Sequence, residues 1–453
     1  MSYLIRKLSA VISLSILATG IFAQTPSNQL PRLAPETLRS DFLLLKDTLQ
    51  KRHAGLYRYK SKAMLDPVFD SCLATIRDSM TVTQFYALTR FALAAIEDGH
   101  TNCKLPRQVL TDYIGKTKVF PALVMFMHNK AFIFCCRQNA DLDKAEILSI
   151  NHRSMDDIIQ HLFDYITSDA GIQSRKNWEI PEDFHLLYNV VIGAKDSYSV
   201  TCKTPAGEIK TAILQADTIK NFICPGPFSR PDKYLKLSYR PGNIAVLTVA
   251  TFFNGFLKTT GENFRHFLDS SFNDLKDKKA TKLVIDLRSN QGGNDDNGEM
   301  LYSYLTPKPF MYYASLETVN GKIAEKDNSE LGWQQPDSNN FKGKVYILIN
   351  GRSFSCSAEF SSIAKSNRRA LFIGEECGGG YYGNTSGGED MVTLPNSQIT
   401  VRIPLVKYTL AVKKTRFKDR GVIPDHIIYP TISDIIEKRD PQLEYTLQLA
   451  QKN

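Results

Sequence analysis

The chain has 453 residues, of which 43% are hydrophobic and 23% are charged, and its formal net charge is +9. This composition is typical of a folded protein with two or three domains, and it excludes a disordered tail or a low-complexity scaffold. The positive charge is mostly dispersed, and no nucleic-acid-binding motif accompanies the basic run at residues 413–418. We therefore predict no nucleic-acid partner.

The N-terminal residues 1–23 have the pattern of a cleaved secretory signal peptide. Arg6 and Lys7 precede an apolar run at residues 8–22, and the small Ala23 ends the segment. The apolar run is shorter than the about 20 residues that a transmembrane helix requires. We expect an exported mature protein, periplasmic or extracellular, with no stable membrane span.

Residues 24–110 are predicted to form an N-terminal helical domain. Apolar positions recur at helical spacing in LRSDFLLLKDTLQKRH and FYALTRFALAAI. Gly99 is a helix stop, so His100 begins the following loop among polar neighbours. This position suits a functional histidine, although an isolated loop histidine is more often only solvated or locally hydrogen-bonded.

Residues 111–220 are predicted to form a β-rich module. Short strand patterns, such as KAFIFCC and YSVTCKT, flank one helical pattern, SMDDIIQHLFDYI. This order resembles a PDZ-like module. An exposed sheet edge in such a module could bind an extended peptide as an added strand, while a purely structural link between domains is the alternative.

Residues 221–453 are predicted to form a catalytic α/β domain, because strand patterns alternate here with helical ones. The strand patterns are NIAVLTV, KLVIDL and KVYILI, and a helical pattern, NFRHFLDSSFNDL, lies between the first two. Such alternation favours a largely parallel sheet whose loops at the strand ends carry the functional groups.

A serine follows the last of these strands at a strand-to-helix turn. The apolar run at residues 345–349 breaks at Asn350 and Gly351, and a helical pattern begins after Ser355. At a helix start, unpaired N–H groups and the positive end of the helix dipole favour an oxyanion, so serine acyl-transfer chemistry is one hypothesis. Simple capping of the helix by Ser355 is the other.

A glycine pair follows the preceding strand of the predicted sheet. Gly292 and Gly293 lack side chains, so they can turn N–H groups toward a reacting carbonyl, and Asn290 can brace their loop. We expect this loop and the Ser355 turn to share one site.

Four motifs together resemble peptidase family S41, which contains the C-terminal processing and tricorn-type proteases. They occur in the family's order, as Asp98-Gly99-His100-Thr101, Asp286-Leu287-Arg288-x-Asn290-x-Gly292-Gly293, Asn350-x-x-Ser353-x-Ser355 and Gly421-Val422-x-Pro424-Asp425. The resemblance implies a multidomain α/β protein with a ClpP/crotonase-like catalytic core. It also implies that Ser355 is the nucleophile and that the N–H groups of Gly293 and Cys356 form the oxyanion hole.

The resemblance leaves two kinds of general base to compare. Processing-type members use a lysine about 25 residues after the serine, but Gly380 stands at that place and cannot accept a proton. Tricorn-type members use the histidine of the Asp-Gly-His-Thr segment, which is His100. A serine precedes that histidine in the tricorn-type site, whereas this chain has Gly99.

The acid that supports His100 is assigned to Asp419, just upstream of the Gly-Val-x-Pro-Asp motif, although the alignment places it one residue off. Glu359 and Glu389 are alternatives, each of which is also explained as a surface charge. Ser357 is a second candidate nucleophile, and a capping or first-turn role is the simpler explanation for it.

The glycine-rich loop at residues 378–384 is predicted to line the substrate cleft, because no P-loop lysine follows it. Its substrate-binding candidates are Gly379, Gly380 and Tyr381, together with Gly292 and Asn290 from the earlier glycine loop. The eight cysteines form no Cys-x-x-Cys pattern, so we predict no metal and no cofactor, and their pairing cannot be deduced.

The predicted function is therefore an exported serine endopeptidase or carboxy-terminal processing-type peptidase, which cleaves peptides or unfolded proteins through an acyl-enzyme. Two alternatives remain. One is a catalytically decayed peptide-binding protein, and the other is a serine esterase that uses the same site.

Overall fold

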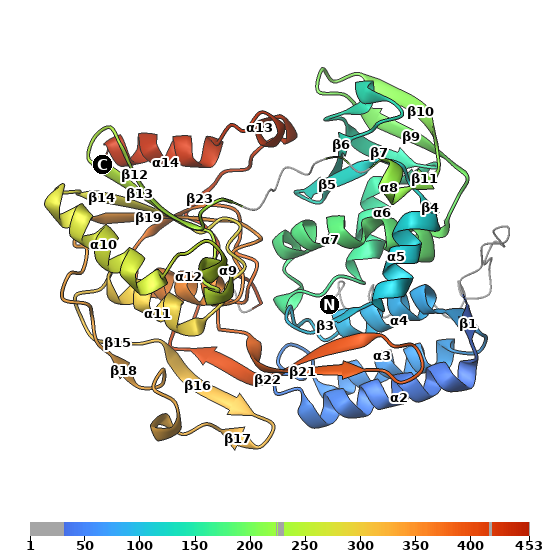
Figure 1. Ribbon diagram of the computed structural model, residues 1–453, viewed down its shortest axis with the longest axis horizontal. Coiled ribbons are helices and arrows are strands. Elements are labelled where there is room, and N and C mark those ends of the chain that lie inside the picture. The colour runs from blue at the N-terminus through green and yellow to red at the C-terminus, as the bar shows by residue number, and fades with distance from the viewer. Residues whose placement is uncertain (1–30, 223, 225–230, 416–418, 453) are drawn as a thin grey trace.

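The computed structural model describes residues 31–222, 224, 231–415 and 419–452. The predicted signal peptide, residues 1–23, lies outside these ranges. The N-terminal part of the chain, residues 31–224, is called the front half, and the C-terminal part, residues 231–452, is called the rear half. Figure 1 shows the front half, coloured blue to green, beside the rear half, coloured yellow to red, with strands of the rear half reaching across to the front helices. No helix of the described residues is both long enough and apolar enough to cross a membrane.

The front half begins with helices that pack through one apolar stripe each. In α2, the residues Leu38, Phe42, Leu45 and Leu49 recur at helical spacing and are buried. A capping box starts α4, since the Thr81 side chain accepts from the Gln84 N–H and the Gln84 side chain accepts from the Thr81 N–H. The helices are α2 (Pro35–Arg52), α3 (Lys62–Thr75), α4 (Val82–Ala94) and α5 (Arg107–Lys116), with short strands β1 (Arg32–Leu33), β2 (Met80–Thr81), β3 (Asn102–Lys104) and β4 (Lys118–Val119).

A 6-stranded antiparallel sheet follows, in the order β10-β9-β7-β6-β5 with β8 paired to β7. Its strands are β5 (Leu123–Met127), β6 (Lys130–Cys135), β7 (Glu146–Ile150), β8 (Arg153–Ser154), β9 (Ser197–Lys203) and β10 (Ile209–Gln215). Between β8 and β9 lie α6 (Met155–Phe163), η2 (Asp169–Gly171), α7 (Gln173–Leu187) and η3 (Tyr188–Gly193). Apolar residues of this sheet and of the front helices form one continuous core.

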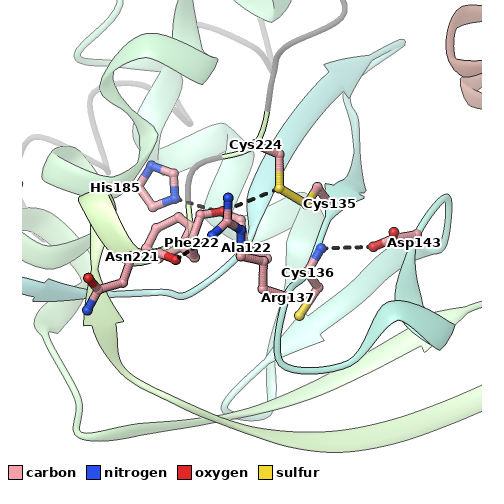
Figure 2. The surroundings of a disulfide bond; sticks show 9 residues. All are labelled: Ala122, Cys135, Cys136, Arg137, Asp143, His185, Asn221, Phe222 and Cys224. Atoms are coloured by element: carbon pink, nitrogen blue, oxygen red, sulfur yellow. Dashed lines mark hydrogen bonds between the residues drawn. A yellow bond between two sulfur atoms is a disulfide. The ribbon is translucent and has the colours of Figure 1, made fainter.

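One disulfide closes this region. Cys135 at the end of β6 is bonded to Cys224, which follows β11 (Asp217–Thr218) and α8 (Ile219–Phe222) (Figure 2). The other cysteines of the described residues are free thiols and buried: Cys72, Cys103, Cys136, Cys202, Cys356 and Cys377. The sequence did not reveal this pairing, because the bonded residues are 89 positions apart.

The rear half contains the predicted α/β layer. A 6-stranded sheet has the order β12-β13-β14-β19-β20-β23, and every neighbouring pair except β12 and β13 is parallel. Its strands are β12 (Leu235–Arg240), β13 (Ile244–Val249), β14 (Lys282–Asp286), β19 (Lys344–Ile349), β20 (Leu371–Gly374) and β23 (His426–Ile427). The helices are α9 (Asn254–Thr259), α10 (Phe264–Asp277), α11 (Asp295–Ser303), α12 (Cys356–Ser366), α13 (Ile432–Ile436) and α14 (Pro441–Lys452). The central strands are almost wholly apolar because both faces of the sheet are covered.

A third sheet joins the two halves. Strand β22 (Thr400–Leu410) pairs with β21 (Thr385–Thr393) and β16 (Tyr313–Thr318) of the rear half, and also with β3 of the front half. The far ends of β21 and β22 lie beside α2 (Figure 1), and Leu394, Ile399 and Val401 belong to the front core. Smaller strands are β15 (Phe310–Met311), β17 (Gly321–Lys322) and β18 (Trp333–Gln334). Since β3 begins two residues after His100, this pairing fixes the histidine segment to the rear half.

Candidate active site

Ser355 lies at a strained turn between β19 and α12. Its backbone has φ 55° and ψ −131°, a conformation that side chains disfavour and that a tightly held turn must impose. Ser353 supplies part of this hold, because its hydroxyl donates to the Leu287 carbonyl at 2.8 Å and accepts from the Asn350 N–H at 3.1 Å. The turn leaves Ser355 partly exposed at the start of α12.

The glycine loop after β14 contacts this turn directly. Asn290 is completely buried, and its side chain accepts from the Gly292 N–H at 2.8 Å and donates to the Val249 carbonyl at 2.9 Å. It therefore braces the loop from behind. Gly292 has φ 92°, and a Cβ at this position would lie 2.7 Å from the Ser355 Cβ. Only glycine lets the loop approach the serine so closely.

Two backbone N–H groups beside Ser355 are left without an acceptor. Within the described residues, neither the Gly293 N–H nor the Cys356 N–H donates a hydrogen bond. Gly293 is exposed, with φ 147°, and a parallel bridge to Phe252 holds it in place. The loop also contacts the N-terminus of α12, because a Cβ on Gly292 would lie 2.9 Å from the Cys356 nitrogen. Free donors in this arrangement are able to bind an oxyanion.

His100 is brought against the same turn from the front half. Its side chain is 3% exposed, and its ring stacks on the ring of Phe354 with centroids 4.5 Å apart. The Arg175 guanidinium lies over the same Phe354 ring at 4.0 Å from the centroid. Neither ring nitrogen of His100 hydrogen-bonds to Ser355 or to any other residue in the described part of the chain. The imidazole thus lies against Phe354, the residue before Ser355, and neither ring nitrogen has a hydrogen-bond partner among the described residues.

The environment of His100 favours the neutral imidazole. Burial lowers its pKa well below the usual value, and the positive charges of Arg402, Arg175 and Arg58 lower it further. A neutral ring nitrogen is able to accept a proton, as a general base must.

Two buried carboxylates lie next to this histidine. One oxygen each of Asp98 and Asp169 and one ring nitrogen of His100 lie within 4.8 Å of one another. Asp98 holds the local turn, since its Oδ1 accepts from the His100 N–H at 2.8 Å and the Thr101 N–H at 2.9 Å. The sequence analysis did not identify Asp169. This residue lies in none of the four motifs, and it is 70 residues after Gly99 in the chain.

Asp419 and Glu389, two of the acids that the sequence suggested, are exposed in the structure. Asp419 is exposed and lines a cavity of about 160 Å³ together with Tyr59, Gly380 and Tyr381, and it makes no hydrogen bond to His100 among the described contacts. Glu389 is exposed on β21 and forms an ion pair with Arg402.

Glu359 is completely buried one turn after Ser355, which differs from the surface charge considered above. Its carboxylate accepts from the Tyr313 hydroxyl at 2.7 Å and from the Asn384 side-chain amide at 2.6 Å. Burial, followed by the charge of Asp295, raises the pKa of Glu359 to about 8. Ser357 is also completely buried, in the first turn of α12, away from solvent.

Residues 243–428 match the sequence model of peptidase family S41. This segment, which contains the glycine loop and the Ser355 turn, belongs to peptidase family S41. It is therefore a serine-type peptidase, and its substrates are peptides or proteins.

The fold extends this likeness over most of the chain. Mature CPAF complexed with lactacystin is 14% identical, with 92% of this chain and 98% of that chain covered and a TM-score of 0.64. Mature CPAF in another crystal structure gives 14% identity, 92% and 97% coverage and a TM-score of 0.62. A putative peptidase from Parabacteroides merdae ATCC 43184 gives 15% identity, 92% and 96% coverage and a TM-score of 0.50.

In this S41 peptidase, the glycine-rich loop packs closely against the serine turn. The Gly378 N–H donates to the Ser353 carbonyl at 3.0 Å, and a Cβ on Gly379 would lie 2.5 Å from the Ala358 Cβ. Tyr381 is 5% exposed. The loop therefore supports α12 from one side and borders the cavity at Asp419 on the other.

Two groups in the S41 peptidase have the side-chain types that bind metal ions. The first is Asp98, His100 and Asp169, and the second is Asp295, Cys356 and Glu359, with the ligand atoms of each group within 4.8 Å of one another. In the first group the Asp98 Oδ1 and both Asp169 oxygens already accept hydrogen bonds from the protein. In the second, both Glu359 oxygens do so. These hydrogen bonds give the acids structural roles, while Asp98 Oδ2 and both His100 nitrogens have no hydrogen-bond partner among the described residues.

Proposed function

We propose that this S41 peptidase cleaves peptide bonds through an acyl-enzyme, with Ser355 as the nucleophile and His100 as the general base. The observation that carries this proposal is the buried His100 ring, which has two unengaged nitrogens and stacks on the residue preceding Ser355. An unsatisfied buried imidazole is costly, so a fold that retains one beside a strained serine is more readily explained by chemistry than by packing.

The reaction begins when the scissile carbonyl binds with its oxygen toward the N–H groups of Gly293 and Cys356. His100 takes the Ser355 hydroxyl proton as the serine oxygen bonds to the carbonyl carbon, and the oxyanion accepts hydrogen bonds from the two amides. The imidazolium then gives its proton to the leaving amine, and the C–N bond breaks to leave the acyl-enzyme. Water attacks the ester by the same route, which releases the second product and restores Ser355. A shift of the His100 ring toward Ser355 accompanies substrate binding, as apo catalytic hydrogen bonds often tighten only in the complex.

Substrate is proposed to bind along the glycine-rich loop. Gly380 and Tyr381 border the cavity that Asp419 also lines, and a Cβ on Gly379 would lie 3.5 Å from the Ser355 nitrogen, which supports a cleft on this side of Ser355. The assignment of Asp419 as the acid that supports His100 stays a prediction.

The middle antiparallel sheet is proposed to act as a PDZ-like peptide-binding module, and the rear sheet as a ClpP/crotonase-like core. Strand β10 supports the first of these, because it is an edge strand with Ile209 and Ile213 exposed at 60% and 61%. An extended peptide would add to such an edge through main-chain hydrogen bonds.

Export to the periplasm or the cell exterior is proposed from the signal-peptide pattern of residues 1–23. The Cys135–Cys224 disulfide supports it, because disulfides persist mainly in oxidising compartments.

The decisive experiment combines a Ser355→Ala variant with a fluorophosphonate probe. Wild-type protein should hydrolyse an unfolded protein substrate and take up the probe at Ser355, and Ser355→Ala should lose both, with turnover reduced by about 10⁴-fold or more. Ser357→Ala is the matched control, since it changes the second candidate nucleophile, in the first turn of α12, and should keep labelling at Ser355.

Unchanged turnover in Ser355→Ala would exclude the proposed nucleophile. Absence of both labelling and turnover in the wild type would favour a catalytically decayed binding protein. Turnover of esters but not of peptides would favour an esterase.

A further inference from the structure

A single buried carboxylate connects the histidine loop to the glycine-rich loop. Asp169 is completely buried in η2, and its Oδ1 accepts from the Gly99 N–H at 2.8 Å while its Oδ2 accepts from the Gly380 N–H at 3.1 Å. Three segments that are distant in the sequence meet at this side chain. Both of its oxygens are engaged with backbone N–H groups, which fixes the relative position of the two loops.

The turn that presents Asp169 is itself attached to the histidine segment. The Ala170 N–H donates to the Glu97 carbonyl at 3.0 Å, and Ala170 has the strained backbone angles φ 50° and ψ 19°. Glu97 in turn forms an ion pair with Lys60 at 3.1 Å. A strained conformation persists only where its surroundings hold it, so this turn is built to place Asp169 where it is.

The two glycines that Asp169 contacts stand at positions where this chain departs from the family pattern. Gly99 replaces the serine that precedes the histidine in tricorn-type sites, and Gly380 replaces the lysine of processing-type sites. A Cβ on Gly99 would lie 2.8 Å from the Phe354 ring and 3.1 Å from the Asp169 Oδ1. A Cβ on Gly380 would lie 2.6 Å from the Tyr59 hydroxyl. The space that both missing side chains would need is therefore filled.

We propose that Asp169 is the positioning residue of this site. Asp169 holds the His100 loop and the glycine-rich loop in a fixed relative position, and its negative charge stabilises the imidazolium that forms when Ser355 is deprotonated. This proposal rests on the proposed function. Asp169 takes over the supporting role for which the chain has neither the family's second serine nor its lysine.

The charges around His100 explain why an anion is needed there. The groups that act on the ring are Arg402 from β22, Arg175 from α7, Arg58, His53 and the carboxylates Asp98 and Asp169. The arginines oppose a positive imidazole, and a cation in a buried site is stable only beside an anion. Burial, and then the charge of Asp98, raises the pKa of Asp169 to about 6, so Asp169 is ionised at neutral pH.

The test is the Asp169→Asn variant, which keeps the size of the side chain and removes its charge. We expect kcat/KM for a peptide substrate to fall about 100-fold, chiefly through kcat, with KM changed by less than about threefold. The acid limb of the pH profile of kcat/KM should move to lower pH by about one unit, because loss of the anion lowers the pKa of His100.

Asp41→Asn is the matched control. Asp41 is also completely buried, its two oxygens accept from the N–H groups of Asn396 and Ser397 at 3.1 Å and 2.7 Å, and it is not among the groups that act on the His100 ring. It should lower the stability to a similar extent and leave the acid limb where it is. If Asp169 had a structural role alone, Asp169→Asn and Asp41→Asn would both leave the acid limb of the pH profile unmoved.

NMR titration of the His100 ring separates this proposal from the proposed function. In a Ser355→Ala background, Asp169→Asn should lower the pKa of His100 by about one unit, independently of turnover. An unchanged His100 titration, or an unmoved acid limb, overturns the positioning role. Peptide cleavage by Ser355→Ala protein overturns the proposed function and leaves the titration result standing.

Discussion

Two buried acidic groups flank Ser355, and they differ in how completely their polar atoms are hydrogen-bonded. On one side, Asp98 and Asp169 surround His100, whose ring nitrogens have no partner among the described residues. On the other side, Asp295 and Glu359 surround Cys356, and both oxygens of Glu359 accept hydrogen bonds. All members of the first group belong to the front half of the chain, and all members of the second belong to the rear half.

This difference shows that burial and a raised pKa are not enough to identify a functional group. Both groups contain carboxyls whose pKa is raised by burial, so a search for shifted pKa values would select both. Within the described residues, both ring nitrogens of His100 lack a hydrogen bond, whereas both oxygens of Glu359 accept one. We infer that the Glu359 group stabilises α12, and that the His100 group does the chemistry.

The largest effect is expected for His100→Ala. Loss of the base should reduce kcat/KM by about 10⁴-fold while the protein stays folded. Steady-state peptide hydrolysis and circular dichroism measure the two outcomes. His185→Gln is the control, because His185 is also buried but bonds the Ala122 carbonyl at 3.0 Å (Figure 2), and it should keep near-normal turnover. Equal losses in both variants would contradict a catalytic role for His100.

A smaller loss is expected for Gly293→Ala. A Cβ at this position would lie 2.1 Å from the Phe253 nitrogen, so the loop must shift and carry the oxyanion-binding N–H with it. Turnover should fall about 10²–10³-fold with little change in KM. Gly115→Ala is the control, since a Cβ there meets nothing within 4 Å. Full activity of Gly293→Ala would remove Gly293 from the oxyanion hole.

Glu359→Gln should change stability more than activity. The pKa of Glu359 is raised from 4.5 to about 8 by burial, so the stability that its neutral form contributes is full below pH 4.5 and is lost as the pH rises toward 8. Glutamine is uncharged throughout, so the variant should lose this decline, which is on the order of 5 kcal/mol in the free energy of unfolding. Urea unfolding across this pH range measures it, and turnover should stay within about tenfold of the wild type.

The exposed Glu389→Gln serves as the control for Glu359→Gln and should keep the wild-type pH dependence of stability. A turnover loss as large as that of His100→Ala would instead place Glu359 in the chemistry and remove the contrast between the two groups.

The smallest effect is expected for Asp419→Asn. Asp419 is exposed at the cavity wall, so its loss should raise KM by about threefold and leave kcat nearly unchanged. Separate determination of kcat and KM on one peptide tests this, with the exposed Asp327→Asn as a control. A 100-fold fall in kcat would support the role that the family resemblance gives to Asp419.

The sequence predicted correctly that the two loops after neighbouring strands of the rear sheet lie together. The Ser355 turn and the Gly292 loop follow β19 and β14, which are adjacent and parallel, so their loops meet at one edge of the sheet. The bracing role of Asn290 was also predictable, because an asparagine two residues before a glycine commonly accepts its N–H. The buried position of Glu359 was not predictable, because its hydrogen-bond partners, Tyr313 and Asn384, lie in distant segments. The exposed positions of Asp419 and Glu389 were likewise not predictable from residue type alone.

By itself, the sequence determined the alternation of strands and helices, the apolar central strands and the glycines that only a close backbone approach requires. These are local properties, which residue type and spacing specify. The tertiary structure decided which imidazole and which carboxylate stand beside Ser355. The pairing of β3 with β22 joins the His100 segment to the rear half, and the η2 turn places Asp169 against Gly99 and Gly380. Such contacts join segments 70 or more residues apart, and they depend on the packing of whole sheets rather than on any local pattern.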